Sequence, residues 1–246
     1  MSRIKPFYEL KFPVSSVKRV ELLSCLAPLL EADSHGQSGR YDIFSQYYDT
    51  PDKQFYQDKV NGEYSKTKIR LRYYRSDNKV GWHFPCLEIK QRRGNLVTKH
   101  RYGLNPDEAA DVLSANPGFN LSETILARCK DPELRSFFAG KILIPAVAVY
   151  YKRSAFHVRG IEGLRLTFDL EIAGLMPGGL GRAGDAASAI LAMRQHAPEI
   201  FEIKSYGRPP EAILNRLVDL GVVQQSFSKY AHAIQALHTQ GLLRLP

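Results

Sequence analysis

Apolar and charged residues alternate along many segments of this chain, with the period of a β-strand. Three segments share one pattern of apolar residue, glutamate, apolar residue and lysine: YELK at 8–11, LEIK at 87–90 and FEIK at 201–204. Side chains of a strand point to opposite faces in turn, so each segment carries its charged pair on one face and its hydrophobes on the other. The pattern predicts a sheet with one charged face.

Further predicted strands cover residues 41–49, 66–75, 142–156 and 164–172. In 66–75 the cations alternate with apolar residues, so that strand is cationic on one face only. Tyr151 and Arg153 share a face of their strand. The residues expected on one face of 164–172 are Arg165, Thr167, Asp169 and Glu171.

Residues 82–102 predict a hairpin that turns at Gly94 and Asn95. With a two-residue loop, Lys90 lies opposite Lys99, and Glu88 lies opposite Arg101. Directly opposed like charges destabilise a sheet, so the two lysines indicate an anion between them. A shift of the register by one residue would separate them, and that alternative remains open.

Helices are predicted at the start, middle and end of the chain, including one from Ser15 or Ser16 to about Glu31 and one from Ser226 to about His238. Short turns between most strands favour an antiparallel α+β fold over alternating βαβ units. A charged face on nearly every strand is either open to water or curled into a wet lumen. Closure removes the sheet edges, so we expect one domain over residues 1–246, an antiparallel β-barrel of about eight strands with packed helices.

Composition and charge narrow the function. The 246 residues carry a formal net charge of +9, which indicates an anionic partner. Few aromatic residues interleave with the cations as base stacking requires, so no nucleic acid is expected. Cys25, Cys86 and Cys129 lack the spacing of a zinc site or disulfide framework. With no long apolar run and no secretory signal, a cytoplasmic protein is expected.

One glycine motif, GLGRAG at 179–184, matches the dinucleotide fingerprint Gly-x-Gly-x-x-Gly. The fingerprint requires a tight turn directly after a strand within a βαβ unit. Here the preceding strand is expected to end near Ile172, and Pro177 intervenes. We interpret the motif as a loop.

The charged faces together predict a site for a linear phosphate chain. Many converging cations need a polyanion, because buried unpaired charge is costly. Carboxylates would repel phosphate directly, and their useful role is to hold Mn²⁺ or Mg²⁺ that bridges to it. Alternatively, each Glu-x-Lys pair lies on an exposed face and contributes only about 0–1 kcal/mol. The expected inward cations are Lys11, Lys68, Arg70, Arg72, Lys90, Lys99, Arg101, Arg153, Arg165 and Lys204, with Glu9, Glu88, Asp169, Glu171 and Glu202 among them.

Nearly the whole chain resembles the VTC domain, the polyphosphate polymerase domain of vacuolar transporter chaperone proteins, within the CYTH and triphosphate tunnel metalloenzyme superfamily. The similar segments occur in the family's order: YELKF at 8–12, YYDTP at 47–51, KIRLRY at 68–73, LEIK at 87–90, VTKHR at 97–101, YKRSAF at 151–156, LRLTFD at 164–169, FEIK at 201–204 and SKY at 228–230.

The resemblance implies a β-tunnel that passes the γ-phosphate of ATP to a growing polyphosphate chain. It implies that Lys11, Arg70, Arg72, Lys204 and Lys229 are catalytic, that Lys68, Lys90, Lys99, Arg101, Tyr151, Arg153 and Arg165 bind phosphate, and that Glu202 holds the metal. Glu9, Glu88, Asp169 and Glu171 are weaker candidates for the metal.

The sequence also departs from the wider family. The superfamily opens with Glu-x-Glu-x-Lys, whereas Phe7 takes the first glutamate's place here, which counts against a plain triphosphatase. Eukaryotic VTC proteins add an SPX domain and transmembrane helices that this sequence lacks, so a separate membrane protein partner is one expectation. A triphosphatase acting in the same tunnel and a non-catalytic polyphosphate-binding module are the alternatives.

Overall fold

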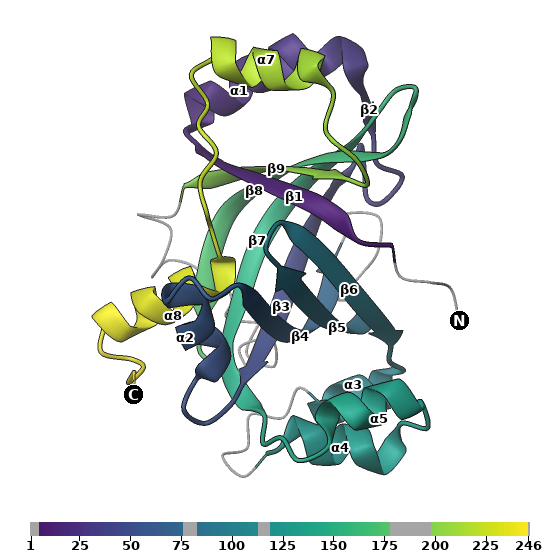
Figure 1. Ribbon diagram of the computed structural model, residues 1–246, viewed down its shortest axis with the longest axis vertical. Helices are drawn as coiled ribbons and strands as arrows, with labels where there is room; N and C mark the ends of the chain where they lie inside the picture. The colour runs from purple at the N-terminus through teal and green to yellow at the C-terminus, as the bar shows by residue number, and fades with distance from the viewer. Residues whose placement is uncertain (1–4, 76–82, 113–118, 178–197, 246) are drawn as a thin grey trace.

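The computed structural model of the chain describes residues 5–75, 83–112, 119–177 and 198–245 (Figure 1). Its strands are β1 Phe7–Val14, β2 Leu30–Ala32, β3 Arg40–Asp49, β4 Ser65–Arg75, β5 His83–Arg93, β6 Leu96–Gly103, β7 Ile144–Val158, β8 Ile161–Leu175 and β9 Glu199–Ser205. Its helices are α1 Ser16–Leu26, α2 Gln54–Val60, α3 Pro106–Val112, α4 Leu121–Arg128, α5 Pro132–Phe138, α7 Glu211–Asp219 and α8 Lys229–Thr239, and η1 Ala27–Leu29 is a 3₁₀ turn.

Eight of the strands form a closed antiparallel barrel, as the sequence predicted. Their order is β7-β3-β4-β5-β6-β1-β9-β8, and β8 pairs with β7 to close the wall. The short strand β2 pairs with the end of β7, beyond the barrel. Closure leaves the wall of eight strands without a free edge.

The predicted hairpin of β5 and β6 has the predicted register. Lys90 faces Lys99, and Glu88 faces Arg101. The neighbouring pairing of β4 with β5 places Lys68 against Lys90 and Arg70 against Glu88. Two adjacent rows therefore cross the wall, one made of three lysines and the next made of a glutamate between two arginines.

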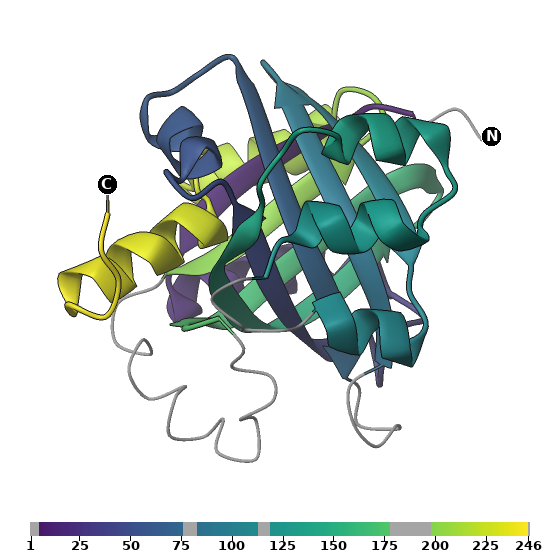
Figure 2. The same ribbon diagram turned by 90° about the horizontal axis from the view of Figure 1, so that it is seen from below.

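Helices pack on the outside of the barrel in three groups, α1 with α7, α3 with α4 and α5, and α2 with α8 (Figures 1 and 2). On one side α1 and α7 lie over β1 and β9, where Leu22, Phe201 and Leu217 belong to one buried apolar cluster. A second cluster includes residues of α3, α4, α5 and α8 with the outward residues of β3, β4 and β7. Because the apolar residues of the strands point outward, the charged residues fill the lumen.

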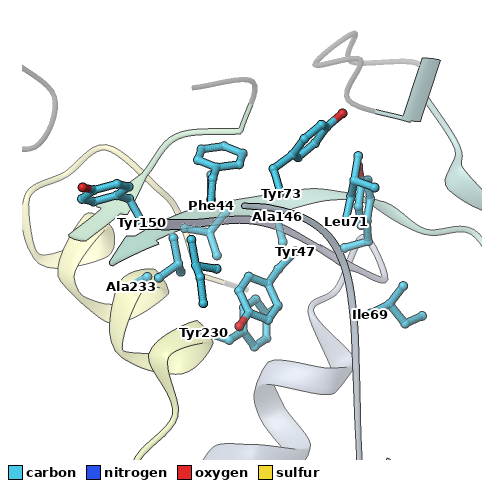
Figure 3. Packing of buried hydrophobic residues seen from close by; sticks show 14 of the residues in the cluster. Phe44, Tyr47, Ile69, Leu71, Tyr73, Ala146, Tyr150, Tyr230 and Ala233 are labelled. Atoms are coloured by element: carbon cyan, nitrogen blue, oxygen red, sulfur yellow. The ribbon is translucent and has the colours of Figure 1, made fainter. Parts of the chain in front are cut away.

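Stacked aromatic rings fix α8 against the barrel. Figure 3 shows Tyr230 of α8 against Tyr47 of β3, with ring centroids 5.0 Å apart. The Tyr230 hydroxyl donates to the carboxylate of Asp49, which also accepts from the backbone N–H groups of Phe55 and Tyr56 at the start of α2. This packing holds the first residue of α8, Lys229, at the lumen, where it is buried.

Two sequence expectations need comment. The helix predicted to reach Glu31 ends at Leu26, because Pro28 cannot continue it, and residues 30–32 instead pair with β7 as β2. The glycine motif at 179–184 lies outside the described residues. Among the described residues, no helix is long and apolar enough to cross a membrane.

Candidate functional site

Three adjacent cavities lie along the lumen. The wide mouth, bounded by Phe7, Tyr41, Tyr74, Arg165 and Tyr206, has a volume of about 860 Å³. The central constriction holds about 40 Å³ and shares Arg72, Lys99, Arg153 and Lys204 with the wide mouth. It shares Glu9, Lys11, Lys68 and Lys90 with the narrow mouth, a cavity of about 140 Å³ that includes Lys59, Lys66, Arg92 and Phe227. The three cavities therefore lie one after another along the lumen.

The constriction is strongly cationic. Its lining combines nine cations with two carboxylates, Glu9 and Glu202, and two tyrosines, Tyr47 and Tyr151. The nine cations are Lys11, Lys68, Arg70, Arg72, Lys90, Lys99, Arg153, Lys204 and Lys229. All nine were predicted as phosphate-binding or catalytic residues, and the barrel brings them together around one narrow passage.

Glu88 lies behind the constriction and holds three arginines. Its carboxylate accepts from Arg70 at 2.6 Å and from Arg101 at 2.9 Å, and it lies 3.4 Å from Arg72. Burial of this fully enclosed carboxyl opposes ionisation, but the guanidinium groups, first that of Arg72, hold its pKa well below the usual range. Glu88 therefore orients cations, with Arg70 on its Oε2 and Arg101 on its Oε1.

A second buried group joins Glu202 and Asp169. The Arg153 guanidinium donates to both carboxylate oxygens of Asp169, at 2.6 and 2.7 Å. Lys229 contacts the carboxylates of Asp169 and Glu202. Lys204 lies 2.5 Å from Glu202. Burial opposes ionisation of Glu202, but Lys204 and Lys229 hold its pKa well below the usual range. Both carboxylates therefore remain charged at neutral pH.

Several lysines of the tunnel are poorly compensated. Burial lowers the pKa of Lys90 and of Lys204 to about 8, although Glu9 and Glu202 act in the opposite direction. Burial and neighbouring cations lower the pKa of Lys68 well below its usual range, and burial does the same for Lys99. A bound anion would relieve this excess, because it favours the charged form of each lysine.

Glu9 and Glu202 are the two carboxylates that line the constriction. Both approach the Lys11 ammonium, at 3.7 and 3.6 Å. The described part of the chain contains no group of three or more histidine, cysteine or acidic residues suited to a metal. Mg²⁺ is often held by one or two carboxylates together with substrate phosphates, so the pair fits a metal that arrives with its phosphate ligand.

Besides Glu88 and Asp169, three predicted site residues do not line the constriction. Arg165 lines the wide mouth, where it contacts Asp33 at 2.6 Å and the Tyr41 hydroxyl at 2.7 Å. Arg101 is at the same mouth, with 55% of its side chain exposed. The inward placement of Glu171 was wrong, because β8 has a bulge there: Glu171 has φ 49 and pairs with Lys152 on the exposed outer face.

Sequence reasoning missed the contribution of β3. The Tyr47 hydroxyl accepts from Arg70 at 2.8 Å, and the Ser45 hydroxyl accepts from Arg72 at 3.3 Å. Ser45 and Tyr47 lie two residues apart on one face of β3, which pairs them directly with the two arginines. That spacing was the available signal, but neither residue carries the charge that marked the other strands.

A closed antiparallel barrel around a cation-lined passage defines the class of triphosphate tunnel folds. The putative adenylyl cyclase HpAC1 from Hippeastrum, described as having a dominant triphosphatase activity, has a similar fold over 97% of both chains, with a TM-score of 0.51 and 15% sequence identity. At that identity the likeness concerns the fold.

The VTC domain matches residues 6–238, and the chain belongs to this family. A relative is subunit 4 of the vacuolar transporter chaperone complex from Schizosaccharomyces pombe, which is 23% identical over 258 aligned residues. The alignment covers 89% of this chain and 35% of the relative, so the chain spans about a third of that protein's length.

Proposed function

We propose that this chain is a polyphosphate polymerase that transfers the γ-phosphate of ATP to a growing polyphosphate chain inside the tunnel. The supporting observation is a cationic passage with a cavity at each end, because a polymer needs a way out that a small hydrolysis product does not. Membership of the VTC domain family supports the same proposal.

The proposed chemistry depends on alignment and charge. Arg70, Arg72 and Arg153 are held by buried carboxylates in fixed orientations, and their guanidinium groups suit phosphate oxygens. Lys11, Lys204 and Lys229 surround Glu202 and would neutralise charge on the transferring phosphoryl group. No general base is required, because the attacking phosphate oxygen is already ionised.

Glu202, with Glu9, would hold Mn²⁺ or Mg²⁺. When bound, the metal would supply further neutralisation of the charge on the phosphates. Glu202 has a second role that the structure describes directly, since its carboxylate contacts three lysines and Arg153. Any ligand that binds these cations competes with Glu202 for them.

The proposal includes a cytoplasmic location and a separate membrane protein partner. The relative named as a complex subunit supports a partner, since subunits act with other chains. Co-purification of the full chain from its own cells, followed by identification of bound membrane proteins, tests this part separately from the chemistry.

Incubation with ATP and Mn²⁺ tests the main proposal. We expect a ladder of phosphate chains on a gel, growing with time. Free phosphate without chains would make the protein a triphosphatase. The similar fold of HpAC1, described as having a dominant triphosphatase activity, is the observation that favours this second function. Binding of polyphosphate without turnover would make it a binding module.

Glu202→Gln tests the metal role. The variant keeps the shape of the side chain but loses its negative charge, so we expect metal-dependent turnover to fall by roughly 10–100-fold or more. Affinity for tripolyphosphate should stay the same or rise, because the released cations can bind the anion. Turnover by the variant equal to that of the wild type would remove Glu202 from the metal site.

A further inference from the structure

The wide mouth is much larger than the passage that it leads to. The constriction holds about 40 Å³, whereas the wide mouth holds about 860 Å³. The lining of the wide mouth combines eight lysines and arginines with two carboxylates, Glu31 and Glu162, and with the aromatic side chains of Phe7, Tyr41, Tyr74 and Tyr206. Sites for small organic molecules have volumes of roughly 300–1,000 Å³ and mix aromatic walls with a few polar groups. A bare phosphate chain does not need this width.

Tyr206 is the aromatic residue best placed to meet a ligand there. It follows the last residue of β9, and half of its surface is exposed. Its ring lies against Gly163, where an added Cβ would come within 2.4 Å of the ring carbon Cδ2. Gly163 also has φ +74, so a side chain at this position is both strained and obstructed. The glycine therefore gives the tyrosine ring its position.

The distance from Tyr206 to the cations suits a nucleotide. Lys204 borders both the wide mouth and the constriction, and it lies two residues before Tyr206. Two residues of extended chain span about 7 Å, which leaves room for a ribose between a stacked base and a phosphate at Lys204. Arg165 and Arg153 also line the wide mouth; Arg165 lies on β8, next to β9, and Arg153 lies on β7, the strand after that.

We propose that the wide mouth binds the nucleoside of a nucleoside triphosphate, with its base stacked on Tyr206 and its phosphates directed into the constriction. This proposal rests on the proposed function, in which a nucleoside triphosphate is the substrate. It adds the place where the base of that nucleotide binds. Glu31 and Glu162 can accept hydrogen bonds from ribose hydroxyl or base amino groups. The Lys5 ammonium, 4.5 Å from the ring centroid of Tyr206, belongs to an exposed side chain that a base would displace towards the phosphates.

The test compares two ligands that share three phosphates, ATP and inorganic tripolyphosphate. Calorimetric dissociation constants are measured at one pH and one Mg²⁺ concentration for the wild type and for Tyr206→Ala. Stacking of a base on an aromatic ring is worth roughly 1–3 kcal/mol, so we expect affinity for ATP to fall by about 5–150-fold. Affinity for tripolyphosphate should change less than about twofold.

Three further variants separate stacking from other roles. Tyr206→Phe keeps the ring and should bind ATP like the wild type. Gly163→Ala should lose ATP affinity selectively, because its Cβ displaces the ring. Tyr64→Ala removes a tyrosine that is 73% exposed and does not line the wide mouth, and it should bind both ligands unchanged.

A spectroscopic readout needs no turnover. In a Trp82→Phe background, which removes the chain's single tryptophan, Tyr206→Trp places a fluorophore at the proposed stack. ATP should quench its emission, and tripolyphosphate should not. Equal quenching by both ligands, or equal loss of both affinities in Tyr206→Ala, would overturn the proposal.

The outcomes also separate this proposal from the proposed function. If Tyr206 variants lose ATP selectively but the wild type forms no chains, the nucleoside site stands and the polymerase proposal fails. If the wild type forms chains and Tyr206→Ala keeps its ATP affinity, the polymerase proposal stands and the nucleoside site is wrong.

Discussion

Glu88 shows how a buried carboxylate can serve stability and binding together. It has no exposed surface, and three arginines surround it. Glu88→Gln removes the charge and leaves buried guanidinium groups unpaired, which typically costs about 3–5 kcal/mol. We expect the free energy of unfolding in urea to fall by this amount, and the loss to shrink when tripolyphosphate is present, because the anion pairs with the same arginines.

The matched control is Glu171→Gln. Glu171 also pairs with a cation, Lys152, but both side chains lie on the exposed outer face. Exposed pairs contribute about 0–1 kcal/mol, so this variant should be nearly as stable as the wild type with or without tripolyphosphate. Similar losses in the two variants would contradict the assigned role of Glu88.

Among the elements, α8 connects the outer apolar packing with the lumen. Ser228 caps this helix by accepting from the Ala231 N–H, and it also accepts from Lys68 at 2.8 Å. Ser228→Ala should lower the free energy of unfolding by about 0.5–2 kcal/mol, as the loss of a cap does. It should also change the affinity for tripolyphosphate, because Lys68 loses its hydrogen-bond acceptor and the helix turn that carries Lys229 loses its cap.

Ser15→Ala provides the comparison. Ser15 caps α1 by accepting from the Lys18 N–H, and it lines none of the three cavities. Its loss should cost a similar amount of stability and leave tripolyphosphate affinity unchanged. If the two variants affect binding equally, Ser228 acts only as a helix cap.

The sequence predicts this site well where the pattern is local. Alternation placed Lys90 and Lys99 on one face, and the turn at Gly94 fixed their register. The bulge at Glu171 could not be predicted, because a glutamate with positive φ leaves no distinctive sequence signal. The contribution of Tyr47 depends on which strands become neighbours, and that is decided by packing between residues far apart in the chain.

At the scale of the whole molecule, the surplus of cations links stability to pH. Lys90 and Lys204 have pKa values of about 8 in the folded protein, while an unfolded lysine titrates near 10.4. Between these values the unfolded chain binds more protons, so the free energy of unfolding rises with pH. The two buried lysines destabilise the folded protein fully below about pH 8, where both are charged, and this destabilisation disappears towards pH 10.

Thermal melting at pH 7.5 and 9.5 checks this linkage. Without ligand, the melting temperature should rise between the two values. The increase that tripolyphosphate produces should shrink over the same interval, because neutral lysines no longer bind the anion. Lys204→Met should weaken both trends, whereas a ligand effect that is equal at both pH values would contradict the role of these lysines.

The closed wall around the constriction has a topological consequence. A groove accepts a ligand from the side, but a passage enclosed by eight strands admits it only by a free end. A ring of six phosphates has no end, so it should bind far more weakly than a linear chain of six in a competition assay. Once threaded, a linear chain can leave only lengthwise, and the same molecule would then be extended many times before it departs.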